Sequence, residues 1–481
     1  MAESQAIVPE THDVASPSFL HRTLRGAWRA IAGVARGKSA DIAPELPPGN
    51  IPRLRKQIRG CVEARGGEVS TRARAAALGA TYLSLTKDGR RRFLEVLADE
   101  TELDPGPVKE AITGLDHATD RHARQQAERV LRVALRSPRI KLYRRFTALP
   151  QGVKFLVDLR ADMLEFRRED SSFDVLEDEL ESLLTSWFDV GFLELRRIEW
   201  DSPASLLEKL IDYEAVHQIQ GWDDLKNRLR TDRRCFAFFH PRMPDEPLIF
   251  VWVALVKGAS DNIQTLLDTS APLLEADAAE TAIFYSISNA QAGLKRISFG
   301  DFLIKRVVDV LASEFSHLKR FSTLSPIPSF SRWLNKRLDE GNDTELLTVA
   351  ERRALGLQPS GDGDADSLKA LLNDPSWHAD PVVSKALKTP LLRLCATYLL
   401  NAKRDSMFAG DSVAHFHLSN GARIDRLNWL ADTSDNGMDR YLGIMVNYRY
   451  ELSEIEANHE HYKSEGLIAA SSLVRGLSKK N

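Results

Sequence analysis

The spacing of apolar residues changes near residue 190 of this 481-residue chain. Before that point apolar residues recur at three- and four-residue intervals, which is the period of an amphipathic helix. A helix is predicted over residues 153–166, and another over residues 121–136, where Ser137 and Pro138 end the pattern. The buried stripe of the first of these helices is predicted to include Val153, Leu156, Val157, Met163 and Leu164. The first half of the chain is therefore predicted to be all-helical.

After residue 190, short runs rich in β-branched and aromatic residues predict strands. These runs cover residues 235–240, 248–256, 282–288 and 321–325. A helix is predicted between the third and fourth runs, over residues 299–315. Its buried face is predicted from the spacing of Leu303, Ile304, Val307, Val308 and Leu311. The order strand, strand, strand, helix, strand indicates a mixed α/β domain in the second half.

The length exceeds what one hydrophobic core usually supports, so at least two domains are expected. Residues 1–50 hold several prolines and little periodicity, and they are predicted to form a flexible leader. Within that leader, residues 19–35 form a basic amphipathic stretch, interpreted as a mobile arm or surface helix. The predicted division is a leader at 1–50, a helical domain at 51–189 and an α/β domain at 190–481.

Composition and charge exclude several classes of protein. A net charge of −3 gives no overall electrostatic signature for nucleic acid or an anionic membrane. The longest apolar run, residues 248–256, is far shorter than a membrane span. The three cysteines are far apart and odd in number, which indicates no disulfide framework or zinc pattern and favours a reducing compartment. The chain ends Ser478-Lys-Lys-Asn481 rather than in a peroxisomal signal, so a cytoplasmic location is expected.

The segment Lys295-Arg-Ile-Ser-Phe-Gly-Asp301 has features of an anion-binding site. It joins a predicted strand to a predicted helix, where unpaired N–H groups and the helix dipole attract anions. Ser298 and Asp301 have the spacing of a capping box, and Gly300 permits close approach of a ligand to the backbone. Lys295 and Arg296 add positive charge, so the segment suits a pyrophosphate. A capped, basic helix start is also common without a ligand.

Two further segments carry candidate chemistry. Ser325-Pro-Ile-Pro328 places a hydroxyl in a stiff turn at the end of a predicted strand, although a serine there can simply end the strand. Residues 413–420 alternate as in a strand, which predicts that His415 and His417 lie on one face. Such a pair can also bind a metal, but no companion ligand pattern completes the site, and no metal is expected.

Three segments, taken in order, resemble the malonyl-CoA decarboxylase family. They are Leu303-Ile-Lys-Arg-Val-Val308 leading into Phe321-Ser-Thr-Leu-Ser-Pro-Ile-Pro328, then His415-Phe-His-Leu-Ser-Asn-Gly-Ala422, then Leu427-Asn-Trp-Leu-Ala-Asp432 leading into Met445-Val-Asn-Tyr-Arg-Tyr450. A more diffuse likeness runs from about residue 60 to the C-terminus. The resemblance implies a helical N-terminal domain followed by a catalytic domain of the N-acetyltransferase (GNAT) fold. It also implies a homo-oligomer, often a tetramer, assembled through the helical domains.

Residue roles follow from this resemblance by matching its motifs. The family's catalytic serine and histidine fall on Ser325 and His417, and supporting polar positions fall on Ser286 and Tyr450. The CoA-contacting positions fall on Lys295, Arg296, Ile297, Ser298, Phe299, Gly300, Asp301 and Ile304. Many members have glycine in place of Arg296, and some have glutamate in place of Ser298. These departures put the two side chains' roles in question, but not contacts through backbone amides.

The implied reaction is decarboxylation of malonyl-CoA to acetyl-CoA without a metal or organic cofactor, because the thioester itself delocalises the enolate charge. His417 is the expected acid, since an imidazole titrates near neutrality, and Ser325 is expected to orient the substrate or to hydrogen-bond His417. Two alternatives remain open: a GNAT-type acyl-CoA transferase, and a non-catalytic malonyl-CoA sensor. CO₂ release without an acceptor distinguishes the first alternative, and binding without turnover distinguishes the second.

Overall fold

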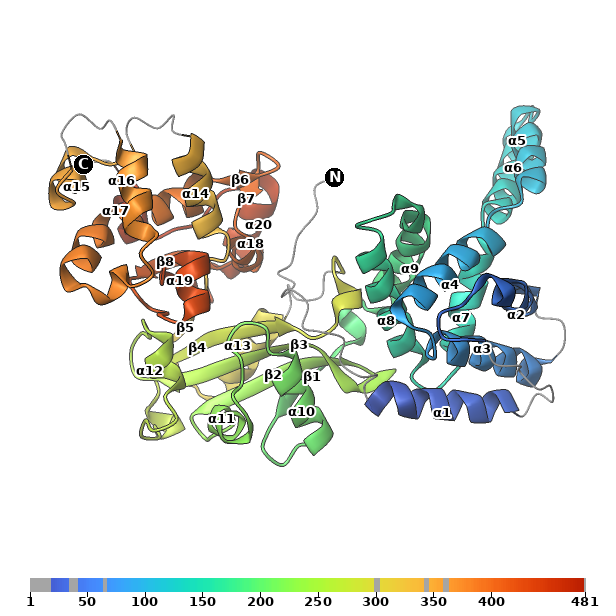
Figure 1. Ribbon diagram of the computed structural model, residues 1–481, viewed down its shortest axis with the longest axis horizontal. Coiled ribbons are helices and arrows are strands. Elements are labelled where there is room, and N and C mark those ends of the chain that lie inside the picture. The colour runs from blue at the N-terminus through green and yellow to red at the C-terminus, as the bar shows by residue number, and fades with distance from the viewer. Residues whose placement is uncertain are drawn as a thin grey trace.

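The computed structural model describes residues 19–33, 42–63, 67–297, 303–340, 346–357 and 363–479. A helical region occupies one end of the molecule, and a curled sheet with attached helices occupies the other (Figure 1). Among the described helices, none combines the length and apolar composition needed to cross a membrane. The helical N-terminal half and the mixed α/β second half predicted from the spacing of apolar residues are both confirmed.

Side-chain caps mark the start of four consecutive helices in the helical region, α4 to α7. Ser137 accepts a hydrogen bond from the N–H of Arg139 and Pro138 follows it, so α7 starts there and the preceding helix ends. Asp120 caps the helix predicted at 121–136 in the same way. The helices are α1 (Phe19–Gly33), α2 (Ile51–Glu63), α3 (Glu68–Tyr82), α4 (Lys87–Glu100), α5 (Pro105–Asp116), α6 (Arg121–Ala134), α7 (Pro138–Phe146), α8 (Gly152–Phe166) and α9 (Asp174–Trp187).

Residues 19–33 form a surface helix, α1, which is one of the two interpretations of this stretch, and the other interpretation, a mobile arm, is wrong. Helix α1 packs into the helical core, where Trp28 is fully buried and its ring stacks on Phe146. The indole N–H donates to the carbonyl of Pro150 at 2.9 Å. Gly79 makes the approach possible, because a Cβ there would lie 2.0 Å from the Trp28 ring. One tryptophan therefore turns a basic amphipathic stretch into part of the core, and this part of the predicted leader is not free.

The α/β region is built on a seven-stranded sheet in the order β1-β2-β3-β4-β5-β9-β8. Neighbouring strands are antiparallel except β4 and β5, which pair in parallel over four residue pairs, from Thr281 opposite Arg320 to Phe284 opposite Thr323. The four strands predicted from runs of β-branched and aromatic residues are present as β2, β3, β4 and β5, and β1, β8 and β9 were not predicted. The strands are β1 (Glu194–Ile198), β2 (Arg233–His240), β3 (Met243–Val256), β4 (Thr281–Asn289), β5 (Arg320–Thr323), β8 (Arg423–Asn428) and β9 (Met445–Tyr450), with β6 (Lys403–Arg404) and β7 (Phe408–Ala409) as a separate pair.

Helices surround this sheet, and α14 to α20 gather at its β8–β9 end (Figure 1). The predicted helix between β4 and β5 is α13, and its five predicted core residues are all buried. The helices are α10 (Ala204–Tyr213), α11 (Trp222–Arg228), α12 (Ile263–Leu267), α13 (Leu303–Glu314), α14 (Phe330–Glu340), α15 (Val349–Ala354), α16 (Asp364–Leu372), α17 (Pro381–Asn401), α18 (Ser412–Ser419), α19 (Asp435–Tyr441), α20 (Ile455–Glu465) and α21 (Ser472–Leu477).

The strand predicted over residues 413–420 is wrong, because this segment forms helix α18. The side chain of Asp411 accepts hydrogen bonds from the N–H groups of Val413 and Ala414, which starts a helix. Eight residues with apolar and polar positions in alternation fit a strand or a short helix almost equally well. The cap decides between the two, and it lies just outside the alternating segment.

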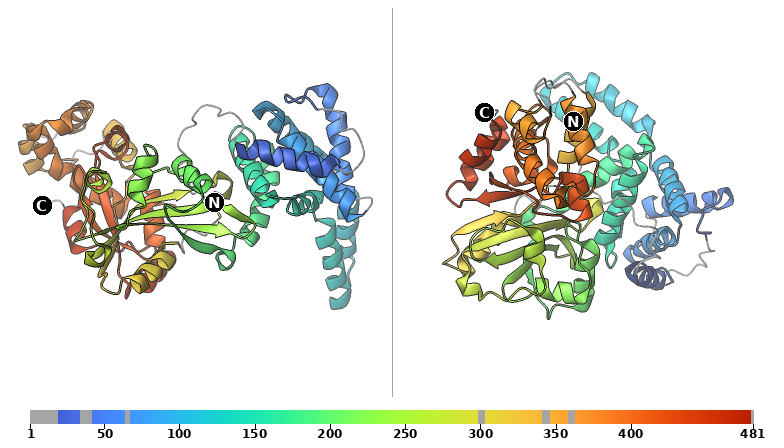
Figure 2. Two further views of the ribbon diagram at one scale, coloured as in Figure 1. Left: turned by 90° about the horizontal axis from the view of Figure 1, so that it is seen from below. Right: turned by 60° about the vertical axis from the view of Figure 1, so that its left-hand side comes forward.

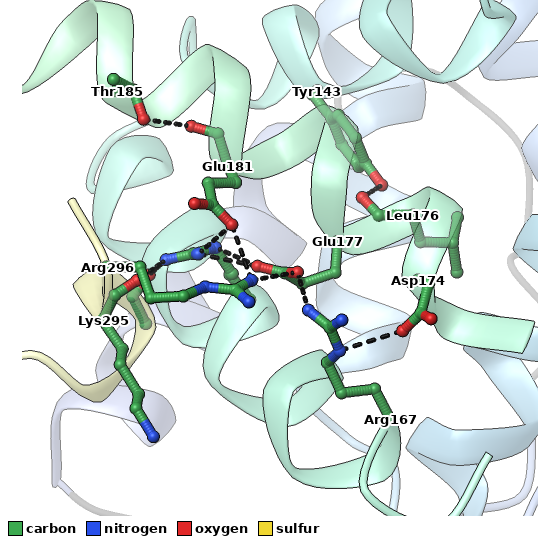
Figure 3. A network of polar contacts seen from close by, with 11 residues as sticks. Tyr143, Arg167, Asp174, Leu176, Glu177, Glu181, Thr185, Lys295 and Arg296 are labelled. Atoms are coloured by element: carbon green, nitrogen blue, oxygen red, sulfur yellow. Dashed lines mark hydrogen bonds and ion pairs between the residues drawn. The ribbon is translucent and has the colours of Figure 1, made fainter. Parts of the chain in front are cut away.

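A buried network of charges joins the helical region to the segment after β4. Arg160 of α8 is fully buried, and it donates to Glu177 of α9 and to the carbonyls of Gly293 and Lys295 at 2.6 and 2.8 Å. Arg296 and Arg167 also approach Glu177 (Figure 3). Burial acts to raise the pKa of Glu177, but Arg160 and Arg296 outweigh it and hold that pKa below its usual range. The negative charge of the fully buried Glu177 carboxylate is therefore compensated by the guanidinium groups of Arg160 and Arg296.

We expect Glu177→Ala to lower the free energy of unfolding by about 3–5 kcal/mol, because it leaves the guanidinium of Arg160 buried without its main partner. Urea unfolding followed by circular dichroism measures this loss. Glu95→Ala is the matched control, since Glu95 forms a half-exposed pair with Arg91 and should cost less than about 1 kcal/mol. Equal losses in the two variants would contradict the importance assigned to the buried network.

Candidate active site around Ser325, His417 and Tyr450

Ser325 lies just beyond β5 and is held by the backbone of β9. Its N–H donates to the carbonyl of Val446 and its carbonyl accepts from the N–H of Val446, both at 2.9 Å. Pro326 and Pro328 follow and restrict the backbone of the turn. The serine hydroxyl is therefore carried by a rigid position at the end of an interior strand of the sheet, and the residue is 6% exposed.

His417 lies in the last turn of α18 and is 2% exposed. The helix is anchored at its start by Asp411, whose other carboxylate oxygen accepts from the N–H of Ser329 at 3.3 Å. Ser329 lies four residues after Ser325. One carboxylate thus connects the helix that carries the histidine to the turn that follows the serine.

The two side chains meet in the interior. The Oγ of Ser325 lies 3.2 Å from Nε2 of His417, and the Nδ1 of His417 lies 2.8 Å from the hydroxyl of Tyr450. The ring of Tyr448 stacks on the imidazole with 4.5 Å between centroids. Both ring nitrogens therefore have hydroxyl partners, and one ring face is covered by an aromatic residue. Three of the predicted site residues, Ser325, His417 and Tyr450, are brought together.

Burial determines the charge of the imidazole. Desolvation lowers the pKa of His417 to about 3, because the imidazolium would have no water and no carboxylate beside it. His417 is therefore neutral at physiological pH. This differs from the expectation of an imidazole that titrates near neutrality, and it means that any proton donated by His417 comes from a neutral ring.

His415 is not on the same face as His417, contrary to the expectation from strand alternation. Two positions along a helix correspond to about 200° of rotation, so the two imidazoles point to different sides. His415 instead contacts the hydroxyl of Tyr462 through Nδ1 at 2.9 Å, and burial lowers its pKa to about 4. Tyr462 also accepts from the N–H of Ala409. His415 therefore supports the β7–α20 side of the helix.

The predicted anion-binding segment is only partly described. Ser298, Phe299, Gly300 and Asp301 lie outside the described residues. Arg296 has a positive φ of 72°, and its guanidinium lies 2.6 Å from Glu177 and 2.7 Å from Glu181. Ile297 and Ile304 are buried in the core. The carbonyl of Lys295 accepts from Arg160. The Arg296 side chain is thus engaged by carboxylates of α9.

Ser286 of β4 belongs to a second buried polar cluster. Its hydroxyl donates to Glu214 at 2.6 Å, and Ser288 and the Trp252 indole donate to the same carboxylate at 3.2 and 3.0 Å. Glu214 also accepts from the N–H groups of Val216 and His217. The hydroxyl predicted as a supporting group is therefore engaged by Glu214.

One group of potential metal ligands emerges from the described part of the chain: Glu177, Asp178 and Glu181 of α9. Glu177 and Glu181 are both paired with the guanidinium groups of Arg160 and Arg296. Two cations already neutralise these carboxylates, so their chemistry is that of an ion-pair network.

Sequence reasoning missed three residues of the site. Asp411 carries the cap signature of an acidic residue directly before a helix, which was available but was overridden by the strand-like alternation. Thr323 lies two residues before Ser325 on the same strand and so on the same face, which is also a local signal. Tyr448 reaches the imidazole only through the pairing of β5 with β9.

The depressed pKa of His417 predicts a pH dependence of stability. In the unfolded chain an imidazole titrates near about 6.5, whereas His417 in the folded protein remains neutral to about pH 3. Between these values the unfolded state binds one more proton, so stability falls as the pH falls through this window. The slope is about 1.4 kcal/mol per pH unit at its steepest.

In His417→Gln, the free energy of unfolding should therefore fall less steeply between pH 6 and pH 4 than in wild type, by about 1.4 kcal/mol per pH unit. Above pH 7.5, where the imidazole is unprotonated in both the folded and the unfolded state, the difference in free energy of unfolding between the variant and wild type should become constant. Urea titrations at a series of pH values measure both regimes. Identical slopes for the two proteins below pH 6 would show that the folded imidazole is protonated there.

Comparisons with known proteins agree along most of the chain. A family profile described as the malonyl-CoA decarboxylase C-terminal domain matches residues 191–481, and one described as the N-terminal domain of the same family matches residues 102–188. The chain is 40% identical over 403 residues to the mitochondrial malonyl-CoA decarboxylase of Rattus norvegicus, covering 81% of each protein. It is 36% identical over 481 residues to that of Anser anser anser, covering 96% of this chain and 94% of the relative.

Solved structures give the same result. The crystal structure of malonyl-CoA decarboxylase from Rhodopseudomonas palustris is 42% identical with a TM-score of 0.80, and it covers 89% of this chain and 99% of its own. That from Agrobacterium vitis is 39% identical with a TM-score of 0.80 and covers 89% and 100%. The resemblance based on the Ser325 and His417 motifs is thereby confirmed at the level of the whole chain. The chain belongs to the malonyl-CoA decarboxylase family of carboxy-lyases.

Proposed function

We propose that this protein converts malonyl-CoA to acetyl-CoA and CO₂ at the pair formed by Ser325 and His417. Membership of the family supports the reaction. The observation that carries the residue assignment is the 3.2 Å approach of a serine hydroxyl to a neutral imidazole, both nearly fully buried, at the junction of β5, β9 and α18. Malonyl-CoA is the substrate, and no metal or organic cofactor takes part.

A GNAT-like fold of the region 190–481 fits its strand order. The single parallel pair, β4 with β5, is hydrogen-bonded over only four residue pairs, although β4 continues to Asn289. Residues 295–301 come between β4 and α13 in the sequence, and Ile304 lies in the first turn of α13; the start of a helix suits contacts with CoA through the backbone. We also propose two domains, a helical domain at 51–189, against which α1 packs, and a catalytic domain at 190–481. A cytoplasmic location is retained as part of the proposal, although the rat and goose relatives are named as mitochondrial.

The chemistry starts with cleavage of the bond between the malonyl carboxyl carbon and the methylene carbon. CO₂ leaves, and the bonding electrons pass into the thioester as an enolate. Ser325 holds the imidazole of His417 beside the substrate through the hydrogen bond between the two side chains. A proton must then be added to the methylene carbon, and His417 supplies it from Nε2. Its low pKa means that a neutral ring donates, a mode that requires simultaneous support at the other nitrogen.

Tyr450 provides that support. Its hydroxyl lies 2.8 Å from Nδ1 of His417 and donates to that nitrogen when the ring proton is on Nε2. As the Nε2 proton moves to carbon, the Tyr450 proton moves to Nδ1, so the ring carries no negative charge. One proton from solvent then restores the tyrosine. The balance is malonyl-CoA plus one proton giving acetyl-CoA plus CO₂.

His417→Ala and Ser325→Ala should each lower kcat for decarboxylation by at least about a hundredfold, as expected when a positioned proton donor or its partner is lost. Both variants should still bind CoA. His415→Ala is the matched control, since it removes an imidazole from the same helix that contacts Tyr462 rather than Ser325. Full activity in either of the first two variants would overturn the assignment of the site.

The same assay addresses the two alternative functions. Purified protein is given malonyl-CoA alone, and separately acetyl-CoA with amine acceptors. Release of CO₂ and formation of acetyl-CoA without an acceptor support decarboxylation. Acylation of the amine without CO₂ release would instead support an acyltransferase, and tight malonyl-CoA binding without turnover would support a sensor.

The protein is also proposed to form a homo-oligomer, a tetramer, through its helical region. Helices α5 and α6 project from the body as a hairpin (Figures 1 and 2). No residue of α6 is buried, and α5 buries only Ala111. Ile112, Val130 and Val133 are 46%, 48% and 58% exposed. An amphipathic hairpin with an exposed apolar face favours contact with another copy of the chain.

Val133→Asp should therefore reduce the oligomer, because a carboxylate placed in an apolar contact loses its hydration. Analytical ultracentrifugation measures the change in mass. Val382→Asp on α17 is the control, since Val382 is 78% exposed and lies outside the hairpin. An unchanged oligomer in the Val133→Asp protein would exclude this face as the contact.

A further inference from the structure

The pairing of β5 with β9 is interrupted beside the site. Phe321 pairs with Tyr450, Ser322 with Arg449, and Ser325 with Val446. This register places Thr323 opposite Tyr448. Ser325 and Val446 exchange two backbone hydrogen bonds, so in a regular antiparallel ladder Thr323 and Tyr448, two positions along, would do the same.

Side chains replace one of these two bonds, the one between the N–H of Tyr448 and the carbonyl of Thr323. The N–H of Tyr448 donates to the hydroxyl oxygen of Thr323 at 3.0 Å instead of to its carbonyl. The Thr323 carbonyl accepts from the side-chain amide of Asn447 at 2.6 Å. Both backbone groups therefore remain satisfied, while the Thr323 hydroxyl is fixed within the sheet by a rigid backbone donor.

The fixed position of the Thr323 hydroxyl determines which way the hydrogen bonds of Ser325 and His417 run. Thr323 and Ser325 are two residues apart on one strand and so lie on the same face. The Ser325 hydroxyl donates to Thr323 Oγ1 at 2.9 Å. A serine hydroxyl has one proton, so toward His417 it can only accept. Nε2 of His417 therefore carries the ring proton, and Nδ1 accepts from Tyr450.

We propose that Thr323 is a positioning residue that orients the Ser325 hydroxyl and thereby keeps His417 in the tautomer protonated at Nε2. This inference rests on the proposed function, in which that proton is transferred to the substrate carbon. Thr323 is fully buried, and it acts through Ser325. Without its oxygen, the Ser325 hydroxyl turns to donate to Nε2, and the ring proton moves to Nδ1, away from Ser325.

The test compares Thr323→Val with Thr323→Ser. Valine keeps the shape of threonine but removes the acceptor, so kcat should fall by about a hundredfold, as for a lost proton donor, while KM for malonyl-CoA is unchanged. Serine keeps the acceptor, so activity should be close to that of wild type. Thr281→Val on β4 is the matched control, because the Thr281 hydroxyl is buried and has no hydrogen-bond partner among the described residues. This control should retain kcat.

A spectroscopic measurement reports the tautomer without reference to activity. Two-dimensional ¹⁵N–¹H spectra of histidine-labelled protein, with His417 assigned by its loss in His417→Gln, should show protonation at Nε2 in wild type and Thr323→Ser. Thr323→Val should show protonation at Nδ1. The wild-type spectrum alone overturns the inference if it shows Nδ1 protonated, even where the valine variant fails to fold.

The outcomes also distinguish this inference from the proposed function. Full activity of His417→Ala would reject the assigned active site, whatever the tautomer. Loss of activity in His417→Ala together with full activity and unchanged tautomer in Thr323→Val would reject only the role of Thr323. A parallel loss of activity in Thr281→Val would show that the valine effect is a general consequence of altering the sheet, and this too would reject that role.

Discussion

The site depends on one carboxylate that connects two distant segments. Ser325 and His417 are 92 residues apart in sequence, and their contact is only as well defined as the placement of α18 against the end of β5. Asp411 determines that placement, because it caps α18 through Val413 and Ala414 and holds the Ser329 N–H with its other oxygen. Burial raises the pKa of Asp411, and the N–H groups that it accepts from act against this rise. The buried acid is therefore balanced by fixed dipoles rather than by a cation.

The burial of His417 away from solvent has a chemical consequence for its imidazole ring. His417 is surrounded by the hydroxyls of Ser325 and Tyr450 and by the ring of Tyr448, none of which is charged at neutral pH. A neutral imidazole has one donor and one acceptor, so the direction of each surrounding hydrogen bond decides what the ring can do. In a solvated site, water could donate to or accept from either ring nitrogen, so the surrounding hydrogen bonds would not fix which nitrogen carries the proton. In this protein the hydroxyl of Thr323, placed by the interrupted ladder of β5 and β9, fixes which nitrogen of His417 carries the proton.

The helical region supports the segment that follows β4. Arg160 reaches from α8 to the carbonyls of Gly293 and Lys295, at the start of the segment proposed to contact CoA. Gly293 permits this close approach, because a Cβ there would lie 1.8 Å from the carbonyl oxygen of Val157. Glu177 and Glu181 hold Arg296 from the same side. A segment with an arginine at positive φ is thus supported by charges from a different region of the chain.

Local patterns in the sequence determined much of the architecture. The strands at 235–240, 248–256 and 282–288 follow from short runs of β-branched and aromatic residues, and the buried face of α13 follows from the helical spacing of its apolar residues. The motif around Ser325 and His417 identified the family, and with it the pair that meets in the structure.

Tertiary structure decided the rest. The segment around His417 is too short for its period to distinguish a strand from a helix, and the cap at Asp411 resolves it. Helix α1 is part of the core because Gly79 leaves room for Trp28. The neutral state of His417 and the position of Thr323 beside Ser325 and Tyr448 depend on burial and on strand register. Burial and strand register both arise only when segments far apart in the chain pack together, so a local pattern of residues cannot predict them.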